Sequence, residues 1–288
     1  MEFRLLTETQ RRQFDEDGFL IVKGALNAEE IGRLIEAGDR LVATECTENR
    51  CDYETAAKTD GFRNCIAMDD AFIPLLCHGK TVPLIVQLLS HNIQLATSHL
   101  IYKHPNPSGT PATHRDPKWH RDIQGTAQDL GHANIPRMEI KCAYYLTDLS
   151  TPNSGVTLMS PGSQKLKHAL DIPAGRVDPL RVAEPLLQAG DAILFENRTW
   201  HAGGANLSGR IRKTVMFGYC YKWLRPMDFM VQPLELIEKV DEIGKQLLDG
   251  LKAPGGKFVP GGINEPLKQW MDQHGLKPRV HEELAVAM

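Results

Sequence analysis

The sequence predicts a mainly β protein whose core is flanked by helices. Helical signals concentrate at the two ends of the 288-residue chain, whereas apolar runs of strand length fill its middle. The strand expected at 139–146 is apolar on both faces, because Cys142 and Tyr144 alternate with Ala143 and Tyr145. A strand that is buried on both faces suits the wall of a barrel with helices packed outside it.

The N-terminal part, residues 1–90, is expected to be largely helical. Thr7 and Gln10 form the pattern of a capping box, and the helix that begins there should end near Gly18. Asn27, with Glu30 three residues later, caps a second helix. We further expect a strand at 19–23, an apolar helix face of Ile31, Leu34 and Ile35, a polar surface loop at 45–66, and two helical pieces within 72–89 separated near Gly79.

Residues 91–225 carry the predicted β core, and residues 226–288 a helical segment. Strands are expected at 95–103, 139–146, 155–160, 192–195 and 214–221, and an amphipathic helix at 234–251. No repeat or low-complexity stretch divides the chain, and all-β barrels often reach this length as one domain. We therefore expect a single domain, 1–288.

The composition excludes several classes of protein. A formal net charge of −3 provides no field that would attract nucleic acid or an acidic membrane surface. No apolar segment reaches membrane-spanning length, and the first residues do not form a signal peptide. The six cysteines show no C-x-x-C spacing. We expect a cytoplasmic protein with reduced cysteines, monomeric or homodimeric, whose partner is a small-molecule substrate, with no nucleic acid and no membrane.

Two distant motifs supply two imidazoles and one carboxylate. They are His120 and Asp122 of Trp-His-Arg-Asp, and His201, which follows an apolar run and precedes two glycines. Two histidines and one carboxylate on one face of a metal leave the other positions open, as in non-haem Fe(II) oxygenases. The open positions can hold a chelating co-substrate and dioxygen. Arg212 offers a planar cation for a distal carboxylate, with Arg210 as its rival.

The first motif has a competing copy at His114 and Asp116. That copy lies in a stretch rich in proline and glycine, and Pro117 disfavours the helical region for Asp116. His120 and Asp122 are flanked by apolar residues instead, which favours them as ligands. For His201 the competing interpretation is a hydrogen-bonded, partly buried histidine at a strand end. The strand before it and the glycines after it favour a ligand beside an open space.

The order of these motifs resembles the phytanoyl-CoA dioxygenase family of Fe(II)- and 2-oxoglutarate-dependent oxygenases. The resemblance is carried by Trp-His-x-Asp, the Pro-Gly-Ser block at 161–163, the Gly-Asp-Ala-Ile-Leu-Phe run at 190–195, and His201 with Arg212. It covers residues 17 to about 223. Within the family, His-Ala-Gly-Gly-Ala-Asn at 201–206 and Gly-Gly-Ile-Asn at 261–264 are similar to oxygenases of fungal alkaloids and meroterpenoids.

The resemblance implies a double-stranded β-helix (a jelly-roll, cupin-like core) and names the site. His120, Asp122 and His201 would bind Fe(II), Arg212 would clamp the distal carboxylate of 2-oxoglutarate, and Thr157 would contact that co-substrate. Two positions depart from the pattern. Gln164 replaces a histidine common in the family, and Lys118 stands where relatives of the fungal type often have glutamine. Lys118 is itself a candidate contact for the co-substrate and the substrate.

The expected reaction is oxidation, most simply hydroxylation, of an unactivated C–H bond in a small natural-product-like molecule. Dioxygen and 2-oxoglutarate are consumed, and succinate and carbon dioxide are released. Because Asp122 is present, halogenation is not expected. Two alternatives stay open: a non-catalytic metal-binding sensor of cupin type and a metal-dependent hydrolase. Candidate substrate residues are Phe62, Ile66, Trp200, Trp223 and Arg225.

Overall fold

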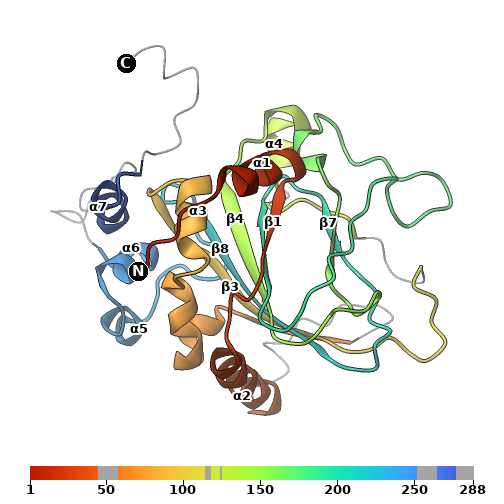
Figure 1. Ribbon diagram of the computed structural model, residues 1–288, viewed down its shortest axis with the longest axis horizontal. Helices are drawn as coiled ribbons and strands as arrows, with labels where there is room; N and C mark the ends of the chain where they lie inside the picture. The colour runs from red at the N-terminus through yellow and green to blue at the C-terminus, as the bar shows by residue number, and fades with distance from the viewer. Residues whose placement is uncertain (45–57, 114–117, 124, 252–264, 277–288) are drawn as a thin grey trace.

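Two antiparallel sheets face each other in the computed structural model, which describes residues 1–44, 58–113, 118–123, 125–251 and 265–276 (Figure 1). The larger sheet has six strands and the smaller sheet two. The strands of the larger sheet are, in spatial order, β1 (Phe19–Val22), β6 (Ala192–Glu196), β4 (Glu139–Tyr145), β8 (Arg212–Tyr221), β3 (Ile93–Lys103) and β2 (Thr59–Arg63). The smaller sheet consists of β5 (Thr157–Met159) and β7 (His201–Gly203). This is the arrangement expected of a double-stranded β-helix.

Helices cover the outer side of the larger sheet (Figure 1). They are α1 (Glu8–Asp17), α2 (Ala28–Thr44), the 3-10 helix η3 (Asp70–Cys77), α3 (Val82–Leu88), α5 (Leu234–Glu238), α6 (Glu242–Leu247) and α7 (Pro266–Gln273). The remaining short helices lie in connections between strands: α4 (Gly125–Leu130) and the 3-10 turns η2 (Cys65–Ala67), η4 (His132–Asn134) and η5 (Ser163–Lys165). The predicted capping box of Thr7 and Gln10 is present. Gly18 ends α1 with a φ of 82°, and a side chain there would collide with the Thr199 hydroxyl.

Alternation along the strands creates two cores. On the outer face, Tyr144, Val215 and Leu100 pack beneath the helices. On the inner face, Tyr145 and Phe195 pack against Leu158 and other residues of the smaller sheet. We use "inner face" for the side of the larger sheet that is turned toward β5 and β7. Because directly paired residues of antiparallel strands share a face, the register assigns every strand residue to one side.

Three sequence-based expectations need correction. The segment 58–66 is not a surface loop, since it contains β2 and η2 (45–57 lie outside the described residues). The helix expected at 234–251 is broken, because Asp241 caps a new helix, α6, by accepting from the Gly244 amide. The strand β7 was not predicted, and α7 falls within the segment 226–288 that was expected to be helical, although no helix had been placed at those residues.

Two smaller expectations also have outcomes. Cys65, Cys77, Cys142 and Cys220 are free thiols, whereas Cys46 and Cys51 lie outside the described residues. Among the described helices, no single one is long and apolar enough to cross a membrane. Two of the described helices, Asp70–Cys77 and Val82–Leu88, meet the criterion of length and composition only when they are taken together, and the pair is bent by 44°.

Candidate metal centre

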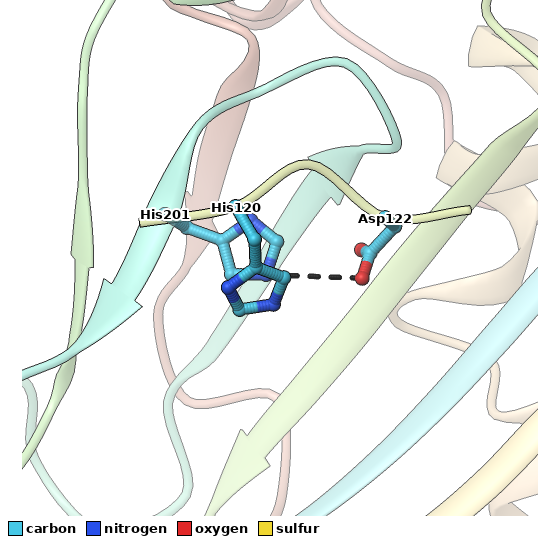
Figure 2. A group of neighbouring side chains, drawn as sticks. All are labelled: His120, Asp122 and His201. Carbon is cyan, nitrogen blue, oxygen red and sulfur yellow. Dashed lines mark ion pairs between the residues drawn. The ribbon is translucent and has the colours of Figure 1, made fainter. Parts of the chain in front are cut away.

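His120 and His201 are brought together by a direct backbone pairing. The amide of each residue donates to the carbonyl of the other at 3.0 Å, which forms an isolated antiparallel bridge. The two imidazole rings consequently lie 4.2 Å apart between their centroids. Figure 2 shows the two rings side by side, with the Asp122 carboxylate opposite them. Residues 81 positions apart in the sequence are thus neighbours by strand pairing.

Hydrogen bonds to the backbone orient both imidazoles in the same way. Nδ1 of His120 lies 2.8 Å from the carbonyl of Lys118, and Nδ1 of His201 lies 2.9 Å from the carbonyl of Thr199. A carbonyl only accepts, so each Nδ1 carries the proton in these bonds. The lone pair of each Nε2 is then free for a metal, which is the orientation that metal-binding histidines require.

Asp122 completes the group. Its Oδ1 lies 3.8 Å from Nε2 of His201 and accepts from the Lys141 ammonium at 2.7 Å, whereas Oδ2 is buried and has no hydrogen-bond partner among the described residues. Burial acts to raise the pKa of Asp122, but the nearby Lys141 and histidines outweigh it and hold the pKa below its usual value. Burial, followed by repulsion from His120, lowers the pKa of His201 to about 4. Asp122 is therefore ionised and His201 neutral at neutral pH, the forms that bind a metal.

The donor set fits a divalent metal. One ligand atom from each of His120, Asp122 and His201 lies within 4.8 Å of the other two, and this is the one such group among the described residues. Two imidazole nitrogens and one carboxylate match the facial set of non-haem iron sites. The competing copy, His114 and Asp116, lies outside the described residues.

Two residues that sequence reasoning missed hold the ligand loops in place. Arg121 is buried and donates to three carbonyls, those of Arg198 (2.7 Å), Ser163 (2.8 Å) and Leu166 (2.9 Å). Asn197 accepts from the Asp122 amide through its own carbonyl at 3.0 Å. Both tie the His120–Asp122 segment to the loop that leads into His201, so the two halves of the site move as one unit.

The side chain of Asn197 also fixes the start of β4. Its Oδ1 accepts from the amides of Met138 at 2.8 Å and Glu139 at 3.3 Å. Such an asparagine has no sequence motif of its own, because its partners lie about 60 positions away in the chain.

Arg212 lies at the opposite end of the inner face from the start of β4. It is the first residue of β8, is 7% exposed, and no carboxylate among the described residues pairs with it. Burial lowers its pKa, which a hydrogen bond with the Tyr145 hydroxyl partly offsets. That hydroxyl donates to Oγ1 of Thr157 at 2.8 Å. Arg210 points outward instead, with 65% of its side chain exposed and Asp148 at 3.7 Å.

The burial of Arg212 next to the Tyr145 hydroxyl favours it over the exposed Arg210 as an anion-binding residue. A buried guanidinium without a carboxylate partner is costly unless a ligand supplies the anion. Within the described ranges, Nε of Arg212 and the neighbouring Thr214 hydroxyl are both buried without hydrogen-bond partners. Tyr145 is a further residue that the sequence did not identify, because its meeting with Thr157 depends on how the two sheets face each other.

Further unpartnered polar groups lie on the same inner face. Nε2 of His99 and both carboxylate oxygens of Glu139 are buried, with no hydrogen-bond partner in the described part of the chain. Burial, then repulsion from Arg63, Lys141 and Arg212, lowers the pKa of His99 well below its usual value. Burial raises the pKa of Glu139 to about 7, because attraction by Lys141 compensates only part of the desolvation. Native interiors rarely leave such groups without a function or a ligand.

The predicted substrate residues are scattered. Phe62 and Ile66 do not reach the site: both are buried in the outer core, and Phe62 pairs with Leu100, which packs beneath the helices. This corrects the prediction, and the physical reason is the strand β2 that the polar pattern concealed. Trp200 packs under the Arg121 guanidinium at 5.3 Å. Trp223, stacked on Tyr221, and Arg225 lie exposed on the segment after β8.

The two departures from the expected pattern have structural roles. Lys118 has an exposed side chain and a φ of 25°, and its carbonyl orients His120. Gln164 is buried and donates to the carbonyls of Asp15 and Glu16, so it fastens the end of α1. The Gly-Gly-Ile-Asn motif at 261–264 lies outside the described residues.

Comparison with known proteins agrees with this geometry. The model of the family phytanoyl-CoA dioxygenase (PhyH) matches residues 14–214. Dioxygenase ALT11 of Alternaria alternata is 25% identical over 88% of this chain and 86% of its own length. Ectoine dioxygenase of Sphingopyxis alaskensis is 23% identical over 56% of this chain and half of its own length.

Solved structures share the fold. The non-haem epimerase SnoN of nogalamycin biosynthesis, in complex with Fe3+, α-ketoglutarate and nogalamycin RO, superposes with a TM-score of 0.58 and 19% identity over 96% of both chains. HygX of Streptomyces hygroscopicus, with nickel and 2-oxoglutarate bound, gives a TM-score of 0.58 and 17% identity over 81% of this chain and 94% of its own.

Proposed function

The chain belongs to the phytanoyl-CoA dioxygenase family and is a 2-oxoglutarate-dependent iron dioxygenase, and we propose that it hydroxylates an unactivated C–H bond of a small natural-product-like molecule. Iron, 2-oxoglutarate and dioxygen together supply the oxidising chemistry and release succinate and carbon dioxide. The residues of this chain bind, orient and shield those components.

The observation that carries the proposal is that a metal-ligand group and a buried cation lie on the same side of the larger sheet. His120, Asp122 and His201 form a ligand group at one level, and a buried Arg212 without a carboxylate partner lies along β8 from it. A metal-binding sensor or a metal-dependent hydrolase has no need for such a cation. A co-substrate that chelates the metal at one end and carries a carboxylate at the other needs both.

We propose the following roles for the residues. Nε2 of His120, Nε2 of His201 and the Asp122 carboxylate bind the iron, and Lys141 holds one oxygen of that carboxylate in place. Arg212 binds the distal carboxylate of 2-oxoglutarate, together with the hydroxyls of Tyr145 and Thr157. Burial of these groups excludes water, which strengthens each charged contact.

A small and partly apolar substrate is supported by the lining and by the relatives. Ala143 and Met216 share the inner face with the charged groups and pack there with other apolar side chains. The structural neighbour SnoN, which belongs to nogalamycin biosynthesis, also supports a substrate of natural-product type. Hydroxylation is the simplest outcome when the carboxylate ligand is retained.

The test is the formation of succinate from 2-oxoglutarate by the purified protein with Fe(II) under air. Wild type should form succinate, and His120→Ala, Asp122→Ala and His201→Ala should each form none. His114→Ala should retain turnover. With a true substrate, the product mass should increase by one oxygen atom. Turnover that survives His120→Ala but is lost in His114→Ala would show that the other motif binds the metal.

A further inference from the structure

Glu139 is a buried carboxylate that the roles assigned so far do not use. It is the first residue of β4 and has no exposed surface, and neither carboxylate oxygen has a hydrogen-bond partner among the residues that the structure describes. The contrast with Asp228 is direct. Asp228 is equally hidden, but it accepts from the Thr97 hydroxyl at 2.5 Å and the Ser98 amide at 2.9 Å.

The register places Glu139 on the inner face, beyond the metal ligands as seen from Arg212. Along β8 and β4, Lys141 is opposite Gly218 and Glu139 is opposite Cys220, whereas Arg212 lies at the other end of β8. Lys141 contacts Asp122, so the Lys141–Gly218 pair marks the level of the metal. A co-substrate that extends from the metal to Arg212 occupies the other direction. The substrate is then expected on the other side of the metal ligands, next to Glu139.

A glycine makes room for this carboxylate. A Cβ at Gly218 would meet Oε1 of Glu139 at 2.5 Å, Cγ2 of Thr97 at 2.7 Å and Cγ of Lys141 at 3.3 Å. Glu139 therefore lies in a niche between three strands rather than at a frayed edge. The charged groups that act on it are Lys141 and Arg63, which attract it, and Asp122 and Asp228, which repel it.

An unpartnered buried carboxylate discriminates strongly between ligands. A ligand that donates a hydrogen bond to it recovers the energy lost on burial, whereas an analogue without a donor leaves the carboxylate unpaired. Sites built in this way reject the analogue that lacks the donor far more strongly than an apolar pocket does. The metal and the co-substrate account for Asp122, Arg212 and Thr214, but they do not account for Glu139.

We propose that Glu139 determines substrate specificity by accepting a hydrogen bond from an N–H or O–H group of the substrate. The substrate is then amphipathic: an apolar skeleton over the iron with an amine or hydroxyl directed to the start of β4. This inference rests on the proposed function, since it assumes that a substrate binds beside the iron.

The experiment measures binding to the protein loaded with Mn(II) and 2-oxoglutarate, which does not turn over. The probes are polycyclic terpenoid alcohols, each paired with its O-methyl ether, which has no hydrogen-bond donor at that position. Dissociation constants are measured by calorimetry for wild type, Glu139→Gln and Glu139→Met. Asp191→Asn is the matched control, because it alters a buried and fully partnered carboxylate that lies beside the end of β4, whereas Glu139 begins that strand.

Wild type should bind the donor-bearing member of a pair about tenfold or more tightly than its methylated form, because the methylated form leaves the buried carboxyl group unpaired. The preference should shrink to about threefold or less in both Glu139 variants and persist in Asp191→Asn. Equal affinity within the pairs, an unchanged preference in the variants, or no binding of any donor-bearing probe would overturn the proposal. Succinate formation by wild type, measured separately, tells whether the proposed function itself has failed.

Discussion

Arg212 and Arg210 are two residues apart but lie in opposite environments, buried and exposed. Arg212→Ala should therefore raise the KM for 2-oxoglutarate by a factor of about 30 or more, because removing the partner of a buried charge costs roughly 2–5 kcal/mol. Arg210→Ala should leave that KM within about twofold, since an exposed ion pair contributes little. Steady-state succinate assays measure both. A large effect in Arg210→Ala with none in Arg212→Ala would reverse the assignment.

Tyr145 and Tyr144 provide a matched pair on opposite faces of β4. Each hydroxyl bonds a threonine hydroxyl, Tyr145 with Thr157 at 2.8 Å inside and Tyr144 with Thr81 at 2.6 Å outside. Tyr145→Phe should raise the 2-oxoglutarate KM by about 2- to 10-fold with little change in kcat, as expected for one lost hydrogen bond. Tyr144→Phe should lower the free energy of unfolding by about 1 kcal/mol and leave KM unchanged. Equal KM effects in both variants would argue against a specific role for Tyr145.

Single residues were predictable from the sequence only where a motif marked them. His120, Asp122 and His201, which the family pattern marks, form one ligand group in the structure. Thr157 and Arg212 both lie next to Tyr145, and their contact with the co-substrate stays a prediction. Lys141, Glu139, Tyr145 and Asn197 were not identified. Their positions in the site follow from pairing between strands that are far apart in the chain, which no local spacing records.

The turn before β6 joins two distant elements through Asp191. Its buried carboxylate accepts from the Lys23 ammonium at 2.8 Å and from the amides of Gly24 and Gln188 at 2.9 Å, which fastens the end of β1 to β6. Asp191→Asn should lower the free energy of unfolding by about 1–3 kcal/mol, because hydrogen bonds to the charged form are lost. Urea unfolding at pH 7 measures the difference.

The Asp191 contribution should depend on pH in a defined direction. Burial acts to raise the pKa of Asp191, but the bonds from Lys23, Gly24 and Gln188 outweigh it and hold the pKa below its usual value. A group with a lowered folded-state pKa stabilises the protein fully above its unfolded value, roughly 4, and loses that effect as the pH falls through the folded value. The difference between wild type and Asp191→Asn should therefore shrink below about pH 4. A constant difference down to pH 2 would contradict this account.

Elements with local signals were the predictable ones. The caps of Thr7 and Asn27 define where α1 and α2 begin, because each cap involves residues only three positions apart. β2 was not recognised because polar residues such as Asp60 line it, although it is buried against β3. The break between α5 and α6 depends on the Asp241 cap, which competes with an otherwise continuous amphipathic pattern.

The two ends of the described chain meet on the outer side of the molecule. Nε1 of Trp270 in α7 donates to the carbonyl of Met1 at 3.2 Å, and the indole is buried in the outer core with Leu267 and Met271. We propose that residues 1–288 therefore unfold as one domain. Trp270→Ala should destabilise the whole chain by about 3–5 kcal/mol while keeping a single transition. A separate early transition for the C-terminal segment in wild type would contradict the one-domain proposal.

At the scale of the molecule, the order of motifs predicted the fold, since a family pattern spread over about 200 residues constrains the topology more than any single strand does. The substrate was not predictable in the same way. Phe62 and Ile66 belong to the outer core, and the inner face next to the metal ligands carries Glu139 and Lys141, neither of which was a candidate site residue. Which face a residue occupies depends on register, and register is fixed only when all six strands pair.

The most direct test of the central claim is a diffraction experiment on crystals grown with Fe(II) and 2-oxoglutarate without oxygen, recorded at the iron absorption edge. The account predicts one anomalous peak, bound by Nε2 of His120, Nε2 of His201 and the Asp122 carboxylate, with the co-substrate extending from it to Arg212. An iron peak at His114 and Asp116, or a 2-oxoglutarate whose distal carboxylate lies away from Arg212, would contradict it.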